Sequence, residues 1–554
     1  MPTIYAMSDI HGYYDIMKKN LDIIDFTDND TKLILCGDYI DYGSDSCKVL
    51  YKIKELVTKY PKQVVVLMGN HEYIFLEFLS LPDNDIQAIE WLSSDKDFST
   101  VNTFISEDTK NKVKSLKKHI TSQNDLIKKC ILLIKGDILK NHFELIKWLK
   151  DLPLYYETDN QIFVHAGIDE ETEEYWSFGT PKEYFVSKYP ATFGKFYKDI
   201  IAGHIGTIQL AKDNSYHEIY WDKQSHYFID GTVEKSGFIP MLAYDTETKK
   251  YSRISALKLL GWNVNQSCLI KNKTTIPGFV IKEIIHEQKP DIFVLVEVFD
   301  LKGEIERLKK EFKGYKLFIA NRETINNTNE VLIGIKNDGN TVVETEPQIM
   351  PQDGNSPNFL QVDAKYQGKG ISIIGTRIKI DSRKKMKKES ENDYEKRMII
   401  DYKERKLQLN SLIKHVNSIE NSVILMGDLN NSRILGDESS TDYKDVKQLY
   451  KGKWTEYYNY HIIKQDFKEV GYDIYTPSKG YSWGGYIKND HIIAKNLKIF
   501  KYEYKQSNSE INKYISMGDY CPGIPDHAIL TANTYIIDSI DSKKKQFNSN
   551  RWIS

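Results

Sequence analysis

Short apolar runs that end in a polar or glycine-containing turn recur through the first 250 residues. Amphipathic stretches with helical spacing of their apolar positions lie between these runs. The runs are TIYAMSD, TKLILCGD, QVVVLMGN and QIFVHAG, and two of the amphipathic stretches are DIMKKNLDIID and CKVLYKIKELVTKY. Strand, turn and helix repeated in this order are typical of an α/β fold.

The pattern changes near residue 250, where strands become more frequent and helices fewer. The later apolar runs are ALKLLGWNVN, DIFVLVEV, KLFIA, EVLIGIK, ISIIGTRIKI, SVILMGDLN, HIIA and AILTANTYI. They predict a second α/β region with two sheets packed together. The junction AYDTETKKYSRIS predicts a hairpin and a short connection. We therefore expect two domains, at residues 1–250 and 255–540, followed by a C-terminal tail at 541–554.

Length and composition narrow the class of protein. The chain has 554 residues, enough for more than one domain, and its apolar runs are too short for a membrane span. Its five cysteines are odd in number and scattered, which is typical of reduced thiols in a cytosolic protein. We therefore expect a cytoplasmic protein with no membrane partner. The sequence leaves the oligomeric state open.

The two halves differ in charge. Residues 1–250 contain 29 Lys and Arg against 39 Asp and Glu, whereas the rest of the chain contains 47 against 39. The basic second half is therefore the better candidate for contact with a polyanion. Arg253 is the first arginine in the chain. The absence of arginine before it limits how the first half can hold a phosphate group.

Polar residues with metal-binding side chains follow the apolar runs of the first half. The turns read SDIHG, GDYIDYG, GNHE, VHAG and AGHIG in chain order. Single residues of this kind usually cap helices or form turns, but five such turns in order favour a shared site. Oxygen and imidazole ligands delivered from several strand ends suit two divalent transition metals. The candidate ligands are Asp9, His11, Asp38, Asn70, His165 and His204.

This ordered set resembles the calcineurin-like metallophosphoesterases, and is most similar to their phosphoprotein phosphatase branch. The resemblance implies a β-sandwich flanked by helices and a site for two Mn, Fe or Zn ions. Asp38 would bridge the metals, with Asp9 and His11 on the first and Asn70, His165 and His204 on the second. It also implies that His71 is the general acid and that Asp41 orients it. Two such metals would activate a bridging water for attack on phosphorus.

Tyr42 departs from the pattern of this family. Relatives usually read GDxxDRG, and their arginine holds the substrate phosphate with two hydrogen bonds. Tyr42 stands at that position here. Tight binding of a phosphomonoester is therefore not expected, and a diester, a nucleotide or a base stacked on Tyr42 becomes a better candidate substrate. A largely helical insert at about residues 83–150 is a further element that could shape the substrate.

The second half has its own set of candidate site residues. The stretch WNVN contains Asn263 and Asn265, Glu297 ends another apolar run, and GDLN contains Asp428 and Asn430. The remaining members are Asp490, Asp526 and His527, each at the start of a late strand. Carboxylates flanked by asparagines suit a hard cation such as Mg²⁺. A histidine paired with an aspartate suits stabilisation of a phosphate in the transition state.

This set resembles the endonuclease/exonuclease/phosphatase superfamily, whose DNase-I-like fold has four layers in the order α/β/β/α. The resemblance covers residues 255–540 and implies that Mg or Mn lies near Asn265, Glu297 and Asp526. Asp428 would orient or deprotonate the attacking water, Asn430 would contact phosphate, and His527, paired with Asp490, would donate to the scissile phosphate. In the substrate-binding set, Asn263 would support the metal-binding carboxylate and Arg377 would contact phosphate.

Two functional hypotheses follow from the pairing of these domains. The first is that a C-terminal nuclease or phosphodiesterase and an N-terminal two-metal phosphatase process nucleic acid or nucleotides. The alternative is a phosphoprotein or nucleotide-signal phosphatase that regulates an attached phosphodiesterase with inositol-phosphate or other specificity. A third reading, in which one half is an inactive binding module, is disfavoured because both candidate ligand sets are complete.

Overall fold

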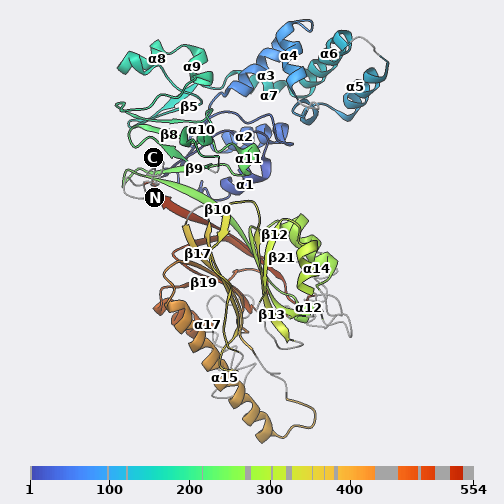
Figure 1. Ribbon diagram of the computed structural model, residues 1–554, viewed down its shortest axis with the longest axis vertical. Coiled ribbons are helices and arrows are strands. Elements are labelled where there is room, and N and C mark those ends of the chain that lie inside the picture. Colours follow the sequence, from blue (N-terminus) through green and yellow to red (C-terminus); the bar gives the residue numbers. More distant parts are fainter. Residues whose placement is uncertain are drawn as a thin grey trace, which may run out of the picture. The chain divides into compact units, whose positions relative to one another are not determined.

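The computed structural model gives the chain a mixed α/β fold with several sheets (Figure 1). It describes residues 3–95, 99–119, 123–214, 216–268, 276–300, 304–319, 327–351, 354–366, 369–379, 385–430, 460–483, 488–505 and 525–540. The described residues form two compact units, one from Thr3–Ser255 with residues 537–540 and one from Ala256–Ile536. The tail expected at 541–554 lies outside the described residues.

The first unit contains strands of two sheets. One set has β1 and β2 parallel, β2 and β3 parallel, and β9 antiparallel to β1. These strands are β1 (Thr3–Met7), β2 (Lys32–Leu35), β3 (Val64–Val66) and β9 (Met241–Asp245). The other sheet has the order β4-β5-β6-β8-β7. Its strands are β4 (Tyr155–Glu157), β5 (Gln161–Val164), β6 (Asp199–Ala202), β7 (Tyr220–Trp221) and β8 (His226–Phe228).

Helices connect these strands and form the insert. The first ones are α1 (Tyr14–Leu21), α2 (Ser46–Lys59) and α3 (Asn70–Ser80). The insert contains α4 (Ile86–Ser94), the 3-10 helix η2 (Val101–Thr103), α5 (Glu107–His119), α6 (Gln123–Asn141) and α7 (Phe143–Lys150). Its predicted helical character is thus confirmed. Shorter helices follow at η3 (Glu170–Tyr175), α8 (Trp176–Gly179), α9 (Lys182–Ser187), α10 (Thr207–Ala211) and α11 (Val233–Ser236).

The core of the first unit joins its two sheets. One cluster of buried side chains contains Ile4 of β1 and Ile34 of β2 together with Phe163 of β5 and Ile201 of β6. Burial of such aliphatic and aromatic side chains stabilises each by about 1.5–3 kcal/mol relative to exposure. Because this packing fixes β1, β2, β3, β5 and β6, it also positions the loops at their carboxyl ends, where the candidate ligands lie.

The second unit also contains two sets of strands. In the first, the later residues of β10 (Lys250–Asn263) pair in parallel with β11, which is antiparallel to β13, and β22 pairs with β10 and β21. Its other strands are β11 (Ile292–Asp300), β12 (Tyr315–Ile319), β13 (Asn327–Lys336), β21 (Lys498–Lys505) and β22 (Ile529–Ser539).

The second sheet of this unit has the order β14-β16-β17-β18-β20-β19, with β15 paired to β16. Its strands are β14 (Thr341–Val343), β15 (Gln348–Ile349), β16 (Asn358–Tyr366), β17 (Lys369–Arg377), β18 (Ser422–Asp428), β19 (Asp473–Tyr475) and β20 (Asp490–Lys495). The helices of the unit are α12 (Asn265–Cys268), α13 (Gly278–Lys282), the π-helix η4 (Glu283–Gln288), α14 (Glu304–Glu311), α15 (Glu391–Asn417) and α17 (Tyr460–Glu469).

Apolar clusters lie between the two sheets of the second unit and on their other faces. The central cluster contains Val294 and Val331 from one sheet and Ile373 from the other. The sheets approach closely at Gly375, where an added Cβ would lie 2.3 Å from Val331 Cγ1. A second cluster packs α13 and α14 against β11, and a third packs α15 and α17 against β17 and β18. Strands β11 and β18, which carry Glu297 and Asp428, are therefore held by packing on both faces of their sheets.

Within the described residues, no helix has the length and apolar character needed to cross a membrane.

Candidate metal centres

The candidate ligands of the first unit lie on tightly turned backbone after the strands. Four of the six candidate ligands, Asp9, His11, Asp38 and His204, have positive φ angles between 46° and 64°, and the neighbouring Asp41 has one of 73°. Residues other than glycine seldom adopt this left-handed conformation, and such residues concentrate at functional sites. Since each turn follows a buried strand, the strain is held by the packing of the strand that precedes it.

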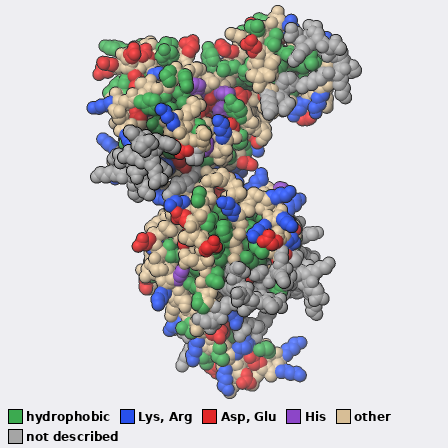
Figure 2. All heavy atoms as spheres, viewed as in Figure 1, with side chains coloured by type: hydrophobic (Ala, Val, Ile, Leu, Met, Phe, Trp, Pro, Cys, Tyr) green, Lys and Arg blue, Asp and Glu red, His purple; other side chains and the backbone are tan. Residues whose placement is uncertain are grey.

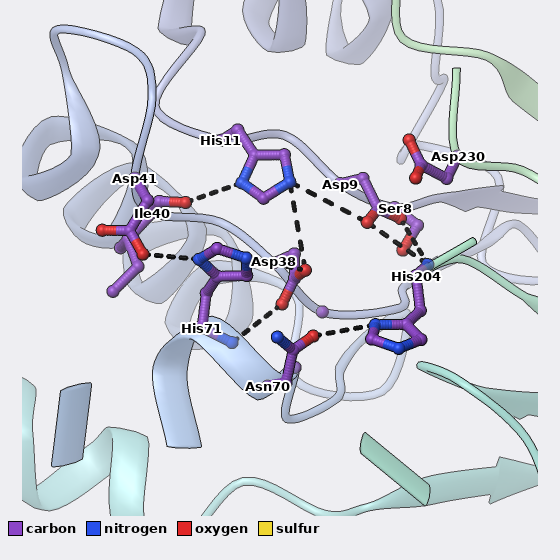
Figure 3. A network of polar contacts seen from close by, with 12 residues as sticks. Ser8, Asp9, His11, Asp38, Ile40, Asp41, Asn70, His71, His204 and Asp230 are labelled. Atoms are coloured by element: carbon purple, nitrogen blue, oxygen red, sulfur yellow. Dashed lines mark hydrogen bonds and ion pairs between the residues drawn. The ribbon is translucent and has the colours of Figure 1, made fainter. Parts of the chain in front are cut away.

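His11 lies between the carboxylates of Asp9 and Asp38 (Figure 3). Its Nε2 atom is 3.9 Å from Oδ1 of Asp9 and 3.9 Å from Oδ2 of Asp38. Its Nδ1–H donates to the carbonyl of Ile40 at 2.8 Å, which fixes the ring and leaves Nε2 as the atom that faces the carboxylates. A backbone carbonyl behind a ligating imidazole is the arrangement that orients metal-bound histidines. This donor set fits a divalent metal.

A second group of donors lies on the other side of Asp38. Nε2 of His165 is 3.3 Å from Oδ1 of Asp38 and 2.8 Å from Oδ1 of Asn70, which also lies 3.0 Å from Nδ1 of His204. The Nδ1–H of His165 is already donated to the carbonyl of Cys36 at 2.7 Å. In the neutral ring, Nε2 therefore presents a lone pair to an amide oxygen. A cation between these atoms would make their close approach favourable, so this donor set also fits a metal.

His71 and Asp41 form a short pair beside Asp38. Nδ1 of His71 donates to Oδ2 of Asp41 at 2.5 Å, and its Nε2 lies 3.8 Å from Oδ2 of Asp38. Burial lowers the pKa of His71, but the two carboxylates outweigh it and raise this pKa to about 9. His71 is also held by its backbone N–H, which donates to Oδ1 of Asp38 at 3.1 Å. The pair therefore has the geometry of a histidine oriented by a carboxylate.

Sequence reasoning missed Glu72, which ties the turns of this site together. Its buried carboxylate accepts hydrogen bonds from the backbone N–H groups of Asp38, Tyr39, Ile40 and Gly69, at 2.7–3.2 Å. Glutamate three residues into a helix is the position from which a side chain reaches back to the helix start, so GNHE carried a usable signal.

Two further residues border this centre. Asp230, also missed from the sequence, is buried beside Asp9, and burial raises its pKa to about 7 (Figure 3). Tyr42 is 61% exposed, and the edge of its ring meets the ring of His11 with 4.8 Å between centroids. Its position at the rim is compatible with contact to a ligand.

The second unit gathers its candidate residues near strand ends of its two sheets, except that Glu297 lies inside β11, where the strand register shifts. The side-chain amide of Asn263, at the end of β10, donates at 3.0 Å to both Glu297 of β11 and Asp428 of β18. Nε of Arg377, at the end of β17, donates to Oε1 of Glu297 at 2.7 Å. Burial would raise the pKa of Glu297, but Arg377, Asn263 and His527 together outweigh it and hold this pKa below its ordinary value. Glu297 is therefore a carboxylate ready to bind a cation.

His527 lies among the other carboxylates of this group. Its Nδ1 donates to Oδ2 of Asp490 at 2.6 Å, and its Nε2 is 4.0 Å from Oδ1 of Asp526. Burial lowers the pKa of His527, but Asp490 and the neighbouring carboxylates raise it to about 10. Burial together with Asp490 raises the pKa of Asp428 to about 6. The arrangement thus combines a protonated imidazole with a carboxyl group that titrates near neutral pH.

The remaining predicted residues have structural contacts of their own. The backbone N–H of Asn265 donates to Oδ1 of Asn263 at 2.9 Å, and that of Asn430 donates to Oδ1 of Asp428 at 2.7 Å. The side-chain amide of Asn430 donates to the carbonyl of Ile378 at 2.7 Å. Both asparagines have positive φ angles, so they form the turns that carry the carboxylates.

Two contacts of this site were not expected from the sequence. The indole N–H of Trp483 donates to Oδ2 of Asp526 at 3.0 Å. Arg405, fully buried on α15, donates to the carbonyl of Leu429 at 2.5 Å, between Asp428 and Asn430. Nothing in the local sequence signals either contact, because each joins residues that are far apart along the chain.

Known proteins resemble the first unit in sequence. Residues 2–208 match the family model of the calcineurin-like phosphoesterases. The symmetrical bis(5'-nucleosyl)-tetraphosphatase of Wigglesworthia glossinidia brevipalpis is 35% identical over 104 residues, which cover 16% of this chain and 36% of that protein. The protein of the same name from Buchnera aphidicola subsp. Acyrthosiphon pisum (strain 5A) is 30% identical over 169 residues, covering 27% and 56%. The chain thus spans between 36% and 56% of the length of these two relatives.

Among solved structures, the endonuclease/exonuclease/phosphatase from Beutenbergia cavernae DSM 12333 is similar over 50% of this chain and 71% of the matched chain. The identity is 13% and the TM-score is 0.35. The family match, by contrast, lies within the first unit, where residues 2–208 resemble the calcineurin-like phosphoesterases.

Proposed function

We propose that this chain is a bifunctional metal-dependent phosphoesterase that acts on nucleic acid or nucleotides. Residues 1–250 form a two-metal phosphatase domain, a β-sandwich flanked by helices. Residues 255–540 form a nuclease or phosphodiesterase domain with four layers in the order α/β/β/α, and 541–554 form a tail. The packing of helices α13 and α14 on one sheet and of α15 and α17 on the other supports this layer order.

The observation that carries the proposal is a separate cluster of carboxylate and imidazole side chains in each unit. Asp38 belongs to both clusters of the first unit, one with His11 and His71 and one with His165 and His204. Asp428, Asp490 and His527 form the cluster of the second unit. In each cluster the donor atoms lie within 4.8 Å of one another. A binding module would need one recognition surface rather than two buried groups of ligands and proton-transfer residues.

In the first unit, Asp9, His11, Asp38, Asn70, His165 and His204 hold two divalent transition metals (Mn, Fe or Zn). Bound metals would supply a nucleophilic water and charge neutralisation at the phosphoryl group. His71 is the general acid, because its Nδ1–H is held by Asp41 and its Nε2 is left to face a leaving group. A pKa of about 9 keeps this imidazole protonated at neutral pH.

Nucleotides are the preferred substrate class for this unit. The name of the two relatives indicates action on a bis(5'-nucleosyl) tetraphosphate. No arginine precedes Arg253, so the guanidinium that would hold a phosphomonoester dianion is missing from the site turns. Tyr42 at the rim offers a ring on which a nucleobase can stack instead.

In the second unit, Glu297, Asn265 and Asp526 hold Mg or Mn, which would neutralise charge on the scissile phosphate when bound. Asn263 supports Glu297, and Asp428 orients the attacking water with Asn430 nearby. His527, kept protonated by Asp490, donates to the scissile phosphate as its negative charge grows. Arg377 lies beside Glu297 and adds a positive charge near the phosphate.

A nucleic-acid substrate is favoured by the charge of the second half. It carries 47 Lys and Arg against 39 Asp and Glu. Lys and Arg side chains spread over much of the visible face of the second unit in Figure 2. Neutralisation of several phosphates by such side chains would give binding that weakens steeply with salt. Cleavage of a phosphodiester in this unit, followed by hydrolysis of the nucleotide product in the first, would make use of both sites.

Product analysis with each site inactivated in turn tests the proposal. Purified chain, Asp38→Asn and Glu297→Gln would be incubated with diadenosine tetraphosphate and with end-labelled single-stranded DNA and RNA, in Mn²⁺ or Mg²⁺. We expect Asp38→Asn to lose the dinucleotide reaction and Glu297→Gln to lose the nucleic-acid reaction. Cleavage of an inositol phosphate, with DNA and RNA untouched in Mg²⁺, would overturn the nucleic-acid assignment. An activity that survives in both variants would overturn the site assignments.

A further inference from the structure

The helical insert reaches the His71–Asp41 pair through the side chain of Thr100. Its hydroxyl donates to Oδ1 of Asp41 at 2.5 Å, while Oδ2 of Asp41 accepts from His71. Thr100 is only 1% exposed. Both oxygens of the Asp41 carboxylate therefore accept a hydrogen bond, one from the imidazole of His71 and one from Thr100, which lies 59 positions further along the chain.

The turn that carries Thr100 is fixed by its own hydrogen bonds. The Asp95 carboxylate accepts from the backbone N–H groups of Thr100 and Val101, each at 3.1 Å. The hydroxyl of Thr103 donates to the carbonyl of Thr100 at 2.7 Å and accepts from the backbone N–H of Cys47 at 3.1 Å. Because Cys47 belongs to α2, the turn touches the segment that follows Asp41 at a second point.

Aromatic packing holds the same turn against α3, the helix that carries His71. Phe104, directly after η2, lies 5.2 Å from Phe75 of α3 between ring centroids. Trp91 of α4 packs at 5.7 Å on Phe75 and 4.3 Å on Phe78. The insert therefore contacts both the loop that carries Asp41 and the helix that carries His71. Contacts of this kind restrict the orientation of a catalytic side chain.

We propose that Thr100 is a positioning residue for the phosphoesterase reaction, holding Asp41 in the orientation that directs His71 at the leaving group. This inference rests on the proposed function of the first unit and assigns the helical insert a part in its site. Without Thr100, the Asp41 carboxylate could rotate and accept hydrogen bonds from water. The Thr100 hydroxyl holds Oδ1, and this fixes the position of Oδ2, the oxygen that His71 uses.

Three variants separate this role from a general effect on folding. Thr100→Val keeps the shape of the side chain but removes the hydroxyl, and Thr100→Ser keeps the hydroxyl. Thr109→Val removes a buried hydroxyl from elsewhere in the insert, on α5, which bonds with Ser106 and not with Asp41 or the turn of Thr100. Hydrolysis of bis-(p-nitrophenyl) phosphate would be measured in Mn²⁺, together with metal content and thermal melting of each variant.

We expect Thr100→Val to lower kcat about five- to tenfold with KM changed less than about twofold, since the step affected is proton transfer rather than binding. Thr100→Ser should recover most of the rate, and Thr109→Val should retain it. A normal kcat in Thr100→Val, or an equal loss in Thr109→Val, would overturn the positioning role.

A readout that does not need catalysis distinguishes failure of this inference from failure of the proposed function. If the unchanged chain is no faster than Asp38→Asn, the proposed function fails. The orientation of His71 is then read from its downfield Nδ1 proton resonance, assigned by its loss in His71→Asn. A resonance displaced in Thr100→Val but not in Thr109→Val supports positioning, and one unchanged in Thr100→Val refutes it.

Discussion

Nδ1 of His527 lies 2.6 Å from Oδ2 of Asp490, and both side chains are buried. The pair joins a residue that opens β20 to one that lies two positions before β22, across 37 positions of the chain. A buried imidazole is normally neutral, but here the carboxylates outweigh the effect of burial and raise the pKa of His527 to about 10. His527 thus carries a positive charge near Glu297.

Replacement of His527 by alanine should leave the fold intact and remove this charge. We expect His527→Ala to lower kcat for nucleic-acid cleavage by about a hundredfold or more, as the loss of one preorganised donor does. Single-turnover cleavage of labelled DNA in Mg²⁺ measures the effect. His415→Ala is the control, since His415 contacts Gln361 on a different face and belongs to no candidate site. Equal losses in the two variants would show that His527 has only a structural role.

Glu297 is the carboxylate on which the proposed Mg²⁺ site depends. Glu297→Gln keeps the size of the side chain and should abolish both nucleic-acid cleavage and its dependence on Mg²⁺ concentration. Hydrolysis by the first unit should continue, because its proposed ligands all precede residue 250. Glu306→Gln serves as the control, as Glu306 is exposed on α14 and pairs there with Lys309. Full cleavage by Glu297→Gln would rule out the assignment.

The turns that carry the ligands could be predicted from the sequence, and the contacts that support them could not. A turn such as GDYIDYG follows an apolar run directly, so local pattern reveals it. Thr100, Arg405 and Trp483 act on residues 24 to 59 positions away, and only the folded chain brings them together. Their roles depend on tertiary contacts rather than on residue type.

Strand β16 shows why part of the fold was also missed. Its sequence NFLQVDAKY contains Gln361 and Asp363, which interrupt an apolar run, and yet Gln361 is buried. The amide of Gln361 donates to Asp363 at 2.9 Å and accepts from His415 of α15 at 2.7 Å. A buried amide is tolerated because both of its ends are bonded. The helix that makes this possible lies far away in sequence.

His226 makes stability of the first unit depend on pH. Its Nδ1 lies 2.9 Å from Asp222 and its Nε2 lies 3.2 Å from Glu170. Burial lowers the pKa of His226, but the Glu170 and Asp222 carboxylates outweigh it and raise this pKa above the ordinary value of 6.5. A raised folded-state pKa contributes stability that is fully present below pH 6.5 and is lost as pH rises through the folded-state pKa.

We therefore expect the thermal midpoint of the first unit to decrease as the pH rises from 6 to 8. The decrease should be smaller in Glu170→Gln. Differential scanning calorimetry across this range measures both, in the absence of added metal. A pH dependence identical in the two proteins would show that the Glu170 contact does not stabilise protonated His226.

Asp38 is the ligand shared by both donor groups of the first unit. Asp38→Asn should therefore weaken binding of two metals rather than one, and it should remove hydrolysis of bis-(p-nitrophenyl) phosphate. Metal content after dialysis, measured by inductively coupled plasma mass spectrometry, gives the number of ions lost. Asp159→Asn, an exposed change between β4 and β5, should retain both metals and activity. Retention of two metals and full activity by Asp38→Asn would contradict the bridging role.

Tyr42 should determine how well the first unit accepts phosphomonoesters. Tyr42 is exposed at the rim of the site, where its ring contacts the ring of His11. Tyr42→Arg places a guanidinium at this position. Burial, Glu234 and Asp41 raise the pKa of Tyr42, so carboxylates lie close enough to orient an arginine there. A bidentate contact to a phosphate dianion should then lower KM for p-nitrophenyl phosphate by about ten- to a hundredfold, with kcat changed less. Tyr175→Arg, at a position 74% exposed on η3, adds the same charge to the unit elsewhere. An unchanged KM in Tyr42→Arg, or an equal gain in Tyr175→Arg, would show that Tyr42 does not face the substrate.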